Sequence, residues 1–355
     1  MTSRERVLAV FRREIPDRVP MWCGASPEFM AKSRAFLGVE DDEAVYQRFH
    51  DDFRRVYSRY AGPEKFDPVK NAAIGSRLNV FGVERKGEGY GVPANTPLKD
   101  ATLEDVENYP WPSADWIDVS HIREDALRYG GEYAIMGGEW CPFFHDLLDL
   151  LGMEDALVMM YEEPEVVHAV LDHLVDYYYA CNQRIFEAAA DVIDIAFMGN
   201  DMGSQNGPLV SVKLFDEFFA PRFKKLCDLA HSYGLFTQMH CCGGFQQLIP
   251  SMHRCGIDAV QSLQPVNQGM QPANLKANYG DQMIFNGAID SVNKLIYGTR
   301  EDCIAATREV VSVMKPGGGY ILSPSHDYLL EMTPVENVLA MYDTCLEIGS
   351  YEAEG

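Results

Sequence analysis

The chain has few basic residues for its length. Its 355 residues include 30 Lys and Arg against 53 Asp and Glu, which gives a formal net charge of −23. Binding to nucleic acid or to an anionic membrane surface requires clustered Lys and Arg, so this balance excludes both kinds of partner. No apolar run approaches the roughly 20 residues of a membrane-spanning helix. The polar residues 1–6 lack the apolar core of a secretory signal.

The sequence also lacks the cysteine spacing of a disulfide framework and the glycine motif of a dinucleotide-binding fold. The nine cysteines are an odd number scattered along the chain, which favours a reducing compartment over a disulfide framework. We therefore expect a cytoplasmic protein, and the sequence leaves its oligomeric state open. No Gly-x-Gly-x-x-Gly follows an early strand, so a dinucleotide-binding fold has no support. The three glycines at 317–319 precede a strand and indicate a turn rather than a phosphate cradle.

Strands and helices alternate from residue 133 onward. This spacing implies parallel strands joined by helical crossovers. We predict an α/β protein, a (β/α)8 TIM barrel with an N-terminal helical elaboration, in which residues 1–355 form one domain. The apolar runs of strand type lie at 133–136, 192–197, 235–239, 258–261, 283–286 and 320–323.

Residues 1–112 are less regular, and we interpret them as including the N-terminal elaboration. The pattern predicts a helix over 4–11 and a buried strand over 19–23. A second helix is predicted over 42–60, and Gly- and Pro-rich turns follow near 87–97.

Polar residues at the ends of the predicted strands are the candidates for a functional site. In a barrel, catalytic residues gather at the carboxyl ends of the strands. Glu139 and Asp201 lie in loops beside glycines, which either bring a carboxylate into a pocket or form plain turns. Gln261 and Asn286 are candidates for lining a polar pocket. The full set is Glu139, Asp201, His240, Cys242, Gln261, Asn286, Asp290 and His326.

The segment His240-Cys241-Cys242-Gly243 carries the most specific local pattern. Two residues apart on an extended chain, His240 and Cys242 point to the same side. Imidazole and thiolate are ligands that zinc prefers, and a catalytic zinc usually takes three protein ligands. His326, after the last strand, is the best-placed third ligand. The alternative is a hydrogen-bonded histidine beside two buried cysteines.

Several segments resemble the uroporphyrinogen decarboxylase superfamily. The resemblance is carried by residues 4–8 with 16–20, 52–56, 199–208, 286–290, and 318–320 with 333–338. It covers nearly the whole chain, and it implies a (β/α)8 barrel with one deep pocket at the strand ends.

The decarboxylases of this superfamily are one functional branch. The chain resembles them at Asp52, the family's central aspartate, and at His326, which falls where they keep a pocket histidine. They carry an Arg-Gln-Ala-Gly-Arg signature after the first strand, whereas residues 23–27 here read Cys-Gly-Ala-Ser-Pro. A substrate with many carboxylates needs arginine partners. The missing arginines argue against a porphyrinogen substrate, and this branch needs no metal.

The cobamide-dependent methyltransferases are the other branch, and the chain resembles them more closely. Their zinc motif, His-x-Cys-Gly, matches His240, Cys242 and Gly243. Their third ligand is a cysteine in a Ser-Pro-Gly-Cys turn, whereas this chain has His326 in Ser-Pro-Ser-His. The resemblance implies zinc held by His240, Cys242 and His326, with a corrinoid protein as partner.

The roles that follow are expectations. Two imidazoles and one thiolate leave Zn²⁺ with a net +1 charge, which favours polarising a substrate oxygen, as in a methyl ether, over delivering a thiolate. Asp52 or Asp201 handles protons, and Glu139 is a reserve for that task. Gln261, Asn286 and Asp290 shape the substrate pocket. Three functions stay open: a zinc-dependent methyltransferase, a metal-independent decarboxylase, and a non-catalytic partner of a corrinoid protein.

Overall fold

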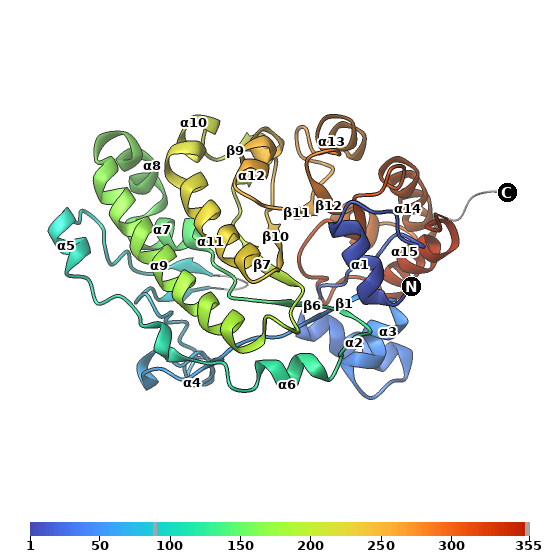
Figure 1. Ribbon diagram of the computed structural model, residues 1–355, viewed down its shortest axis with the longest axis horizontal. Helices are drawn as coiled ribbons and strands as arrows, with labels where there is room; N and C mark the ends of the chain where they lie inside the picture. The colour runs from blue at the N-terminus through green and yellow to red at the C-terminus, as the bar shows by residue number, and fades with distance from the viewer. Residues whose placement is uncertain (88–90, 352–355) are drawn as a thin grey trace.

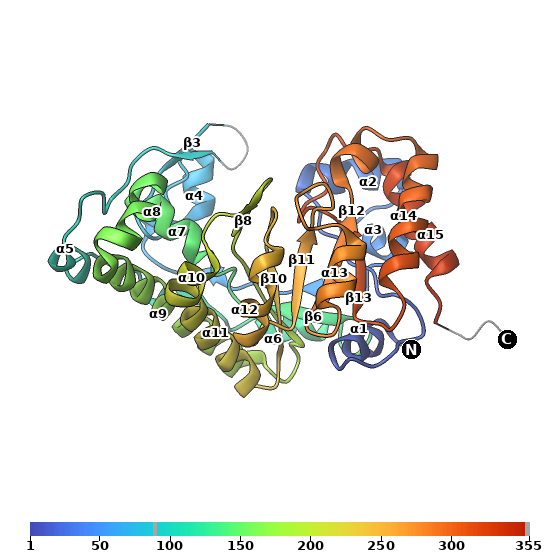
Figure 2. The ribbon, with the colours of Figure 1, turned by 90° about the horizontal axis from the view of Figure 1, so that it is seen from above.

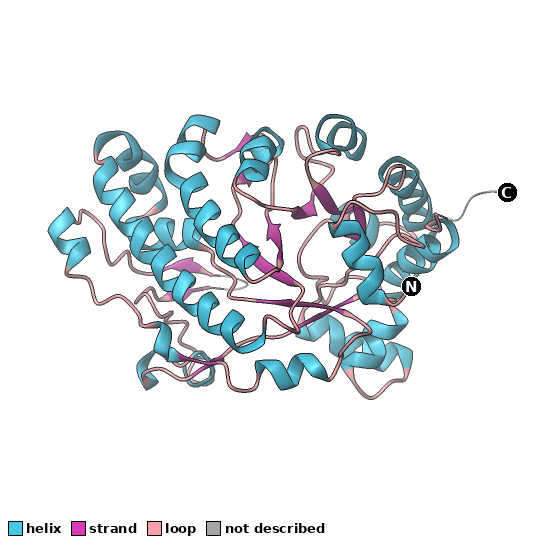
Figure 3. Cartoon of the chain, viewed as in Figure 1, coloured by secondary structure: helices cyan, strands magenta, loops and turns pink. Residues whose placement is uncertain are grey.

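A curled sheet of parallel strands forms the centre of the computed structural model, which describes residues 1–87 and 91–351. Figures 1 and 3 show the strands in the middle of the molecule and the helices around them. The seven strands of this sheet lie in the order β1 (Phe53–Arg55), β6 (Ala134–Gly137), β7 (Ile195–Gly199), β10 (Phe236–His240), β11 (Ala259–Leu263), β12 (Ile284–Ile289) and β13 (Tyr320–Pro324).

A short extended segment around Met21 joins the two edges of this sheet. On one side Met21 pairs in parallel with Leu322, and Trp22 N donates to Leu322 O at 3.0 Å. On the other side Asp52 N donates to Met21 O at 2.9 Å. Eight parallel extended segments thus form a closed ring, which confirms the (β/α)8 barrel predicted from the sequence.

Helices cover the outside of the ring, in the crossovers between its strands (Figure 2). Within the described residues, no helix is both long and apolar enough to cross a lipid bilayer. After α1 (Ser3–Phe11), the α-helices of the described chain are α2 (Pro27–Leu37), α3 (Asp42–Arg48), α4 (Pro68–Ala73), α5 (Leu103–Glu107), α6 (Ile122–Leu127), α7 (Phe143–Leu151), α8 (Met153–Glu162), α9 (Pro164–Ala189), α10 (Val212–Leu214), α11 (Ala220–Ser232), α12 (Ile249–Arg254), α13 (Pro272–Tyr279), α14 (Arg300–Met314) and α15 (Val335–Ile348).

Helix α1 (Ser3–Phe11) packs against the amino-terminal end of the barrel. Its Thr2 cap forms a capping box with Glu5, and Arg4 N donates to Glu132 O just before β6. The buried side chains of α1 join one apolar cluster with inward-facing residues of the strands. That cluster comprises Val7, Val10, Phe11, Trp22, Phe53, Ala134, Met136, Ile195, Phe197, Ala259, Ile284 and Ile321.

The first third of the chain contributes more to the barrel than the sequence pattern indicates. The segment around Met21 and strand β1 are both barrel strands within residues 1–112. The helix predicted over 42–60 is wrong beyond Arg48, because the chain turns at His50 (φ 56°) and enters β1. The non-barrel part of this region includes β2 (Arg59–Tyr60), β3 (Arg85–Lys86) and β4 (Val92–Pro93), and β2 pairs with β5 (Ile117–Asp118).

Candidate functional site

A cavity of about 750 Å³ opens at the carboxyl ends of the barrel strands. Residues at or just after the ends of β1, β6, β7, β10 and β13 line it, as expected for a barrel active site. The segment between β1 and β6 adds Asn79 and Arg85. Its lining includes Arg55, Tyr57, Ser58, Arg85, Glu139, Trp140, His145, Asp146, Asp149, Phe197, Asp201, His240, Cys242, His326, Asp327 and Tyr328.

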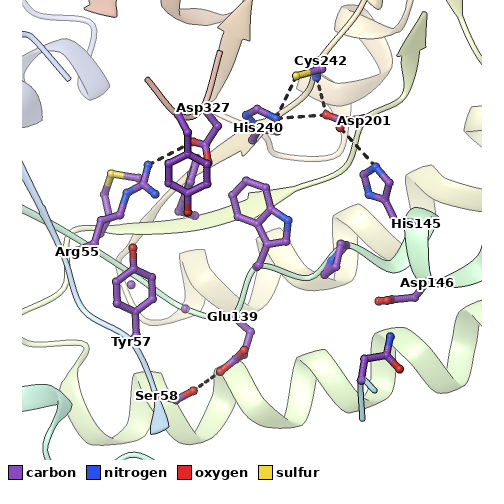
Figure 4. A pocket seen from close by; sticks show the side chains of 18 of the residues that line it. Arg55, Tyr57, Ser58, Glu139, His145, Asp146, Asp201, His240, Cys242 and Asp327 are labelled. Atoms are coloured by element: carbon purple, nitrogen blue, oxygen red, sulfur yellow. Dashed lines mark hydrogen bonds and ion pairs between the residues drawn. The ribbon is translucent and has the colours of Figure 1, made fainter. Parts of the chain in front are cut away.

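Three potential metal ligands meet on one wall of this cavity: Asp201, His240 and Cys242 (Figure 4). His240 Nε2 lies 3.2 Å from Asp201 Oδ1 and 3.3 Å from Cys242 Sγ. A tetrahedral zinc ion with bonds of about 2.0–2.3 Å would separate such atoms by about 3.3–3.6 Å. The measured spacings therefore fit a zinc ion with only small movements.

The backbone around this group is held tightly. Asp201 Oδ1 accepts the N–H of Cys242 at 2.8 Å, so the two loops that carry these residues are joined directly. Gly243 has φ 88°, and a Cβ there would lie 2.2 Å from the carbonyl carbon of Gly203. Only glycine permits both this backbone angle and this close approach. His145, at the start of α7, reaches Asp201 Oδ2 at 3.5 Å from the far side.

Electrostatics couple these residues. Burial alone would raise the pKa of Asp201, but hydrogen bonds with His145 and His240 lower it far below its usual value. Burial alone would lower the pKa of His240, yet its hydrogen bonds with Asp201 and Cys242 raise it well above the usual value. A bound cation would take the place of that proton.

Two carboxyl groups elsewhere in the cavity are poor acids. Burial raises the pKa of Glu139, and the Ser58 hydroxyl, which donates to Glu139 Oε1, opposes this shift. Burial also raises the pKa of Asp146 to about 7, even though Tyr178 donates to its Oδ2 at 2.6 Å. Asp146 can therefore hold a proton near neutral pH, and burial shifts the pKa of Glu139 in the same direction.

A half-buried arginine, Arg55, lies across the cavity from the metal-ligand group (Figure 4). The guanidinium carbon of Arg55 lies 4.7 Å from the ring centre of Trp22 and 4.8 Å from that of Phe197, within cation–π range. Its Nη2 lies 3.5 Å from Asp327 Oδ1. Burial alone would lower the pKa of Arg55, but Asp327 and Tyr57 raise it, so the side chain is a permanent cation.

His326 lies in the cavity but is not part of the metal-ligand group. Its Nδ1 accepts the N–H of Tyr328 at 3.2 Å, and Asp201 takes the third position that the sequence gives to His326. The correction changes the charge, because one thiolate, one carboxylate and one neutral imidazole would leave Zn²⁺ neutral. The expected net +1, and the preference for a substrate oxygen argued from it, do not apply to this set.

Gln261 and Asn286 lie inside the barrel, below the cavity, and do not line it. Both are fully buried. Gln261 Oε1 contacts His240 Nδ1 at 2.6 Å, and Asn286 Nδ2 donates to Gln238 Oε1 at 3.3 Å. The expectation that they shape the substrate pocket is therefore corrected: Gln261 contacts a candidate ligand from behind, and Asn286 contacts another buried amide.

Asp52 and Asp290 have structural partners away from the cavity. Asp52 precedes β1, at the amino-terminal end of the barrel, and its carboxylate is bound by Arg6 and Arg18. Asp290 caps the helical turn that follows β12, accepting the N–H groups of Val292 and Asn293 at 3.0 Å. We correct both expectations accordingly: Asp52 stabilises the fold, and Asp290 is a helix cap.

Several cavity residues are absent from the candidates that the sequence predicts. Arg55, Tyr57 and Ser58 directly follow β1, and the strand-end rule would have found them had this strand not been interpreted as helix. His145 and Asp146 lie on α7. No strand-end pattern marks them, because only the packing of α7 brings them to the cavity.

Comparisons with known proteins show which family the chain resembles. Residues 119–348 match the family model described as uroporphyrinogen decarboxylase (URO-D). The methylcobamide:CoM methyltransferase MtbA of Methanosarcina mazei is 23% identical, with 96% of this chain and 97% of that protein covered. Its counterpart in Methanosarcina acetivorans is 26% identical, with the same coverage.

Two further similarities extend this picture. The uroporphyrinogen decarboxylase of Prochlorococcus marinus is 29% identical, with 95% of each chain covered. A solved structure described as a methyltransferase from Methanosarcina mazei aligns with a TM-score of 0.68 at 19% identity, and the alignment covers 98% of this chain and 99% of that one. At this identity the structural likeness shows the fold.

Proposed function

Because the chain belongs to the uroporphyrinogen decarboxylase family, we propose that it is a zinc-dependent methyltransferase of that family. In this proposal it moves a methyl group between a corrinoid protein and a small substrate. The substrate is a thiol, a methyl ether or a methyl amine. The full-length similarity to two methylcobamide:CoM methyltransferases supports an enzyme of this class. The observation that carries the proposal is the group of Asp201, His240 and Cys242 in the cavity.

The donor set fits zinc in chemistry as well as spacing. Imidazole nitrogen, thiolate sulfur and carboxylate oxygen are the three ligand types that zinc accepts, and three protein ligands are usual for a catalytic zinc. When bound, zinc would act as a Lewis acid on the sulfur, oxygen or nitrogen of the substrate.

The chain's own residues have separate tasks in this proposal. Asp201 accepts the N–H of Cys242, and His145 contacts the other carboxylate oxygen of Asp201. Glu139 accepts from Ser58 at Oε1, which leaves Oε2 to carry a proton for a departing substrate group. Trp140, Tyr57 and Tyr328 give the cavity an aromatic part of its lining. The nine cysteines are all free, which supports a cytoplasmic location.

Metal content tests the proposal directly. We expect about one zinc per chain in the purified protein and in His326→Ala, and strongly reduced zinc in Asp201→Ala, measured by mass spectrometry of the metals. Methyl transfer is then followed with free methylcobalamin and a thiol, through the change in the visible corrinoid spectrum. A chain that neither binds zinc nor demethylates methylcobalamin would contradict the proposal.

A decarboxylase is the second candidate, and two observations favour it. Arg55 lines the cavity, so a guanidinium does reach the pocket despite the missing arginines after the first barrel strand. The similarity to the Prochlorococcus marinus decarboxylase also covers nearly the whole chain. The position of Asp52 outside the cavity opposes it. Release of CO2 from uroporphyrinogen by the metal-free protein would favour this function over methyl transfer.

The third function is a non-catalytic partner of a corrinoid protein. Co-purification of a corrinoid protein without zinc or turnover would favour it over both enzymes.

A further inference from the structure

Strand β11 contacts the metal-ligand group from the side away from the cavity. His240 pairs in register with Gln261 on this strand, and Gln261 Oε1 lies 2.6 Å from His240 Nδ1. Gln261 is fully buried. It touches a candidate ligand, and no substrate in the cavity would reach it.

The contact between Gln261 and His240 determines which tautomer the imidazole adopts. An amide oxygen can only accept a hydrogen bond, so His240 Nδ1 must carry the hydrogen. In the neutral ring the lone pair then lies on Nε2, the atom that faces Asp201 and Cys242. The opposite assignment of the amide would place an N–H₂ donor at Nδ1 and a hydrogen on Nε2, which cannot bind a metal.

A bulge in β11 brings the next residue to the same group. The register shifts between Gln261 and Leu263, and Ser262 has a left-handed φ of 75°. In a regular strand, neighbouring side chains point to opposite faces. Here Ser262 Oγ lies 3.4 Å from Cys242 Sγ while Gln261 contacts His240. Such a conformation is unfavourable for a non-glycine residue and is common at functional sites.

We propose that Gln261 is a positioning residue for the metal site. Its amide oxygen holds His240 in the tautomer that presents Nε2 to the ion, and the bulge at Ser262 positions β11 so that the Gln261 side chain contacts His240. The inference rests on the zinc site of the proposed function. A histidine ligand whose second nitrogen is held in this way is a better donor, and loss of the holding group usually weakens metal binding about 10- to 100-fold.

The experiment compares four full-length proteins: wild type, Gln261→Glu, Gln261→Met and the control Gln238→Met. Gln238 is also a fully buried amide of the barrel interior, but its hydrogen bond is to Asn286. Zinc affinity is measured by competition with a chelator. We expect Gln261→Met to weaken binding about 10- to 100-fold, Gln261→Glu to keep or increase it, and Gln238→Met to leave it close to wild type.

A spectroscopic measurement separates tautomer control from general packing. In the Co²⁺-loaded protein, a histidine bound through Nε2 shows its Nδ1 proton as a strongly shifted, exchangeable NMR signal. We expect a slowly exchanging signal in wild type and Gln261→Glu, and fast exchange in Gln261→Met. Because Gln261→Glu keeps both the shape and the acceptor, it also tests the inference if Gln261→Met does not fold.

Each remaining outcome has one meaning. Equal loss of affinity in Gln261→Met and Gln238→Met overturns the inference in favour of packing, and weak binding by Gln261→Glu overturns the acceptor role. A wild-type protein that binds neither zinc nor cobalt overturns both this inference and the zinc site. If the affinities follow the expected order but no methyl transfer is found, the proposed function fails while the role of Gln261 stands.

Discussion

Two aspartates at opposite ends of the barrel show how the surroundings of a carboxylate decide its use. Asp52 precedes β1 and has no exposed surface, and five hydrogen bonds from Ser3, Arg6, Arg18 and the backbone of Met21 saturate both oxygens. Asp201 follows β7, its side chain is 39% exposed, and its neighbours are two histidines and a cysteine.

The difference lies in the kind of partner. Arginine is always charged, so a carboxylate enclosed by Arg6 and Arg18 has no capacity left for a proton or a metal. Imidazole and thiol can lose protons and become metal ligands, so Asp201 keeps that capacity. At the amino-terminal end of the barrel, the Asp52 carboxylate therefore stabilises the fold. At the carboxyl-terminal end, the Asp201 carboxylate stays available for binding.

The substitution Asp52→Asn should give the largest effect. It leaves the buried Arg6 with Asp17 alone and removes the carboxylate partner of Arg18, and breaking a buried ion pair costs about 3–5 kcal/mol. We expect a fall of this size in the free energy of unfolding, measured by denaturant titration, whereas the zinc content of the folded fraction should not change. A loss of zinc at unchanged stability would place Asp52 in the functional site and break the comparison.

Asp146 provides an intermediate case, a carboxyl group at the cavity wall whose hydrogen bond comes from the neutral Tyr178 hydroxyl. Its folded-state pKa of about 7 lies above the usual unfolded value of about 3.9. Between these values the folded chain keeps a proton that the unfolded chain has lost, so stability falls as pH rises. The slope is at most about 1.4 kcal/mol per pH unit.

The variant Asp146→Asn tests this case. Because asparagine can still accept from Tyr178 but does not titrate, the difference in unfolding free energy between the variant and wild type should grow by roughly 2 kcal/mol in favour of the variant from pH 5 to pH 7. Parallel pH profiles for the two proteins would show that Asp146 is ionised in the folded chain, like Asp52.

The sequence predicts the residues around Asp201 in the cavity better than it predicts the structural ion pairs of Asp52. His240 and Cys242 could be found because a strand-end His-x-Cys is a local pattern, and the barrel followed from the spacing of strands and helices. Asp52 was assigned a catalytic role from family resemblance, since no local pattern reveals that Arg6 and Arg18 converge on it. The exchange of His326 for Asp201 in the metal-ligand group depends on how two loops pack, which spacing along the chain does not encode.

The substitution Asp201→Asn should have the smallest effect on stability and the more specific effect on binding. Asp201 is 39% exposed, so solvent screens its pair with the buried His240, and asparagine can still accept the N–H of Cys242 through its amide oxygen. We expect a nearly unchanged free energy of unfolding in the metal-free protein and clearly weaker zinc binding, both measured on one preparation. His326→Ala serves as the control, because it removes a cavity residue outside the metal-ligand group. If Asp201→Asn unfolds the protein as readily as Asp52→Asn does, both carboxylates are structural, and the third metal ligand has to be sought elsewhere.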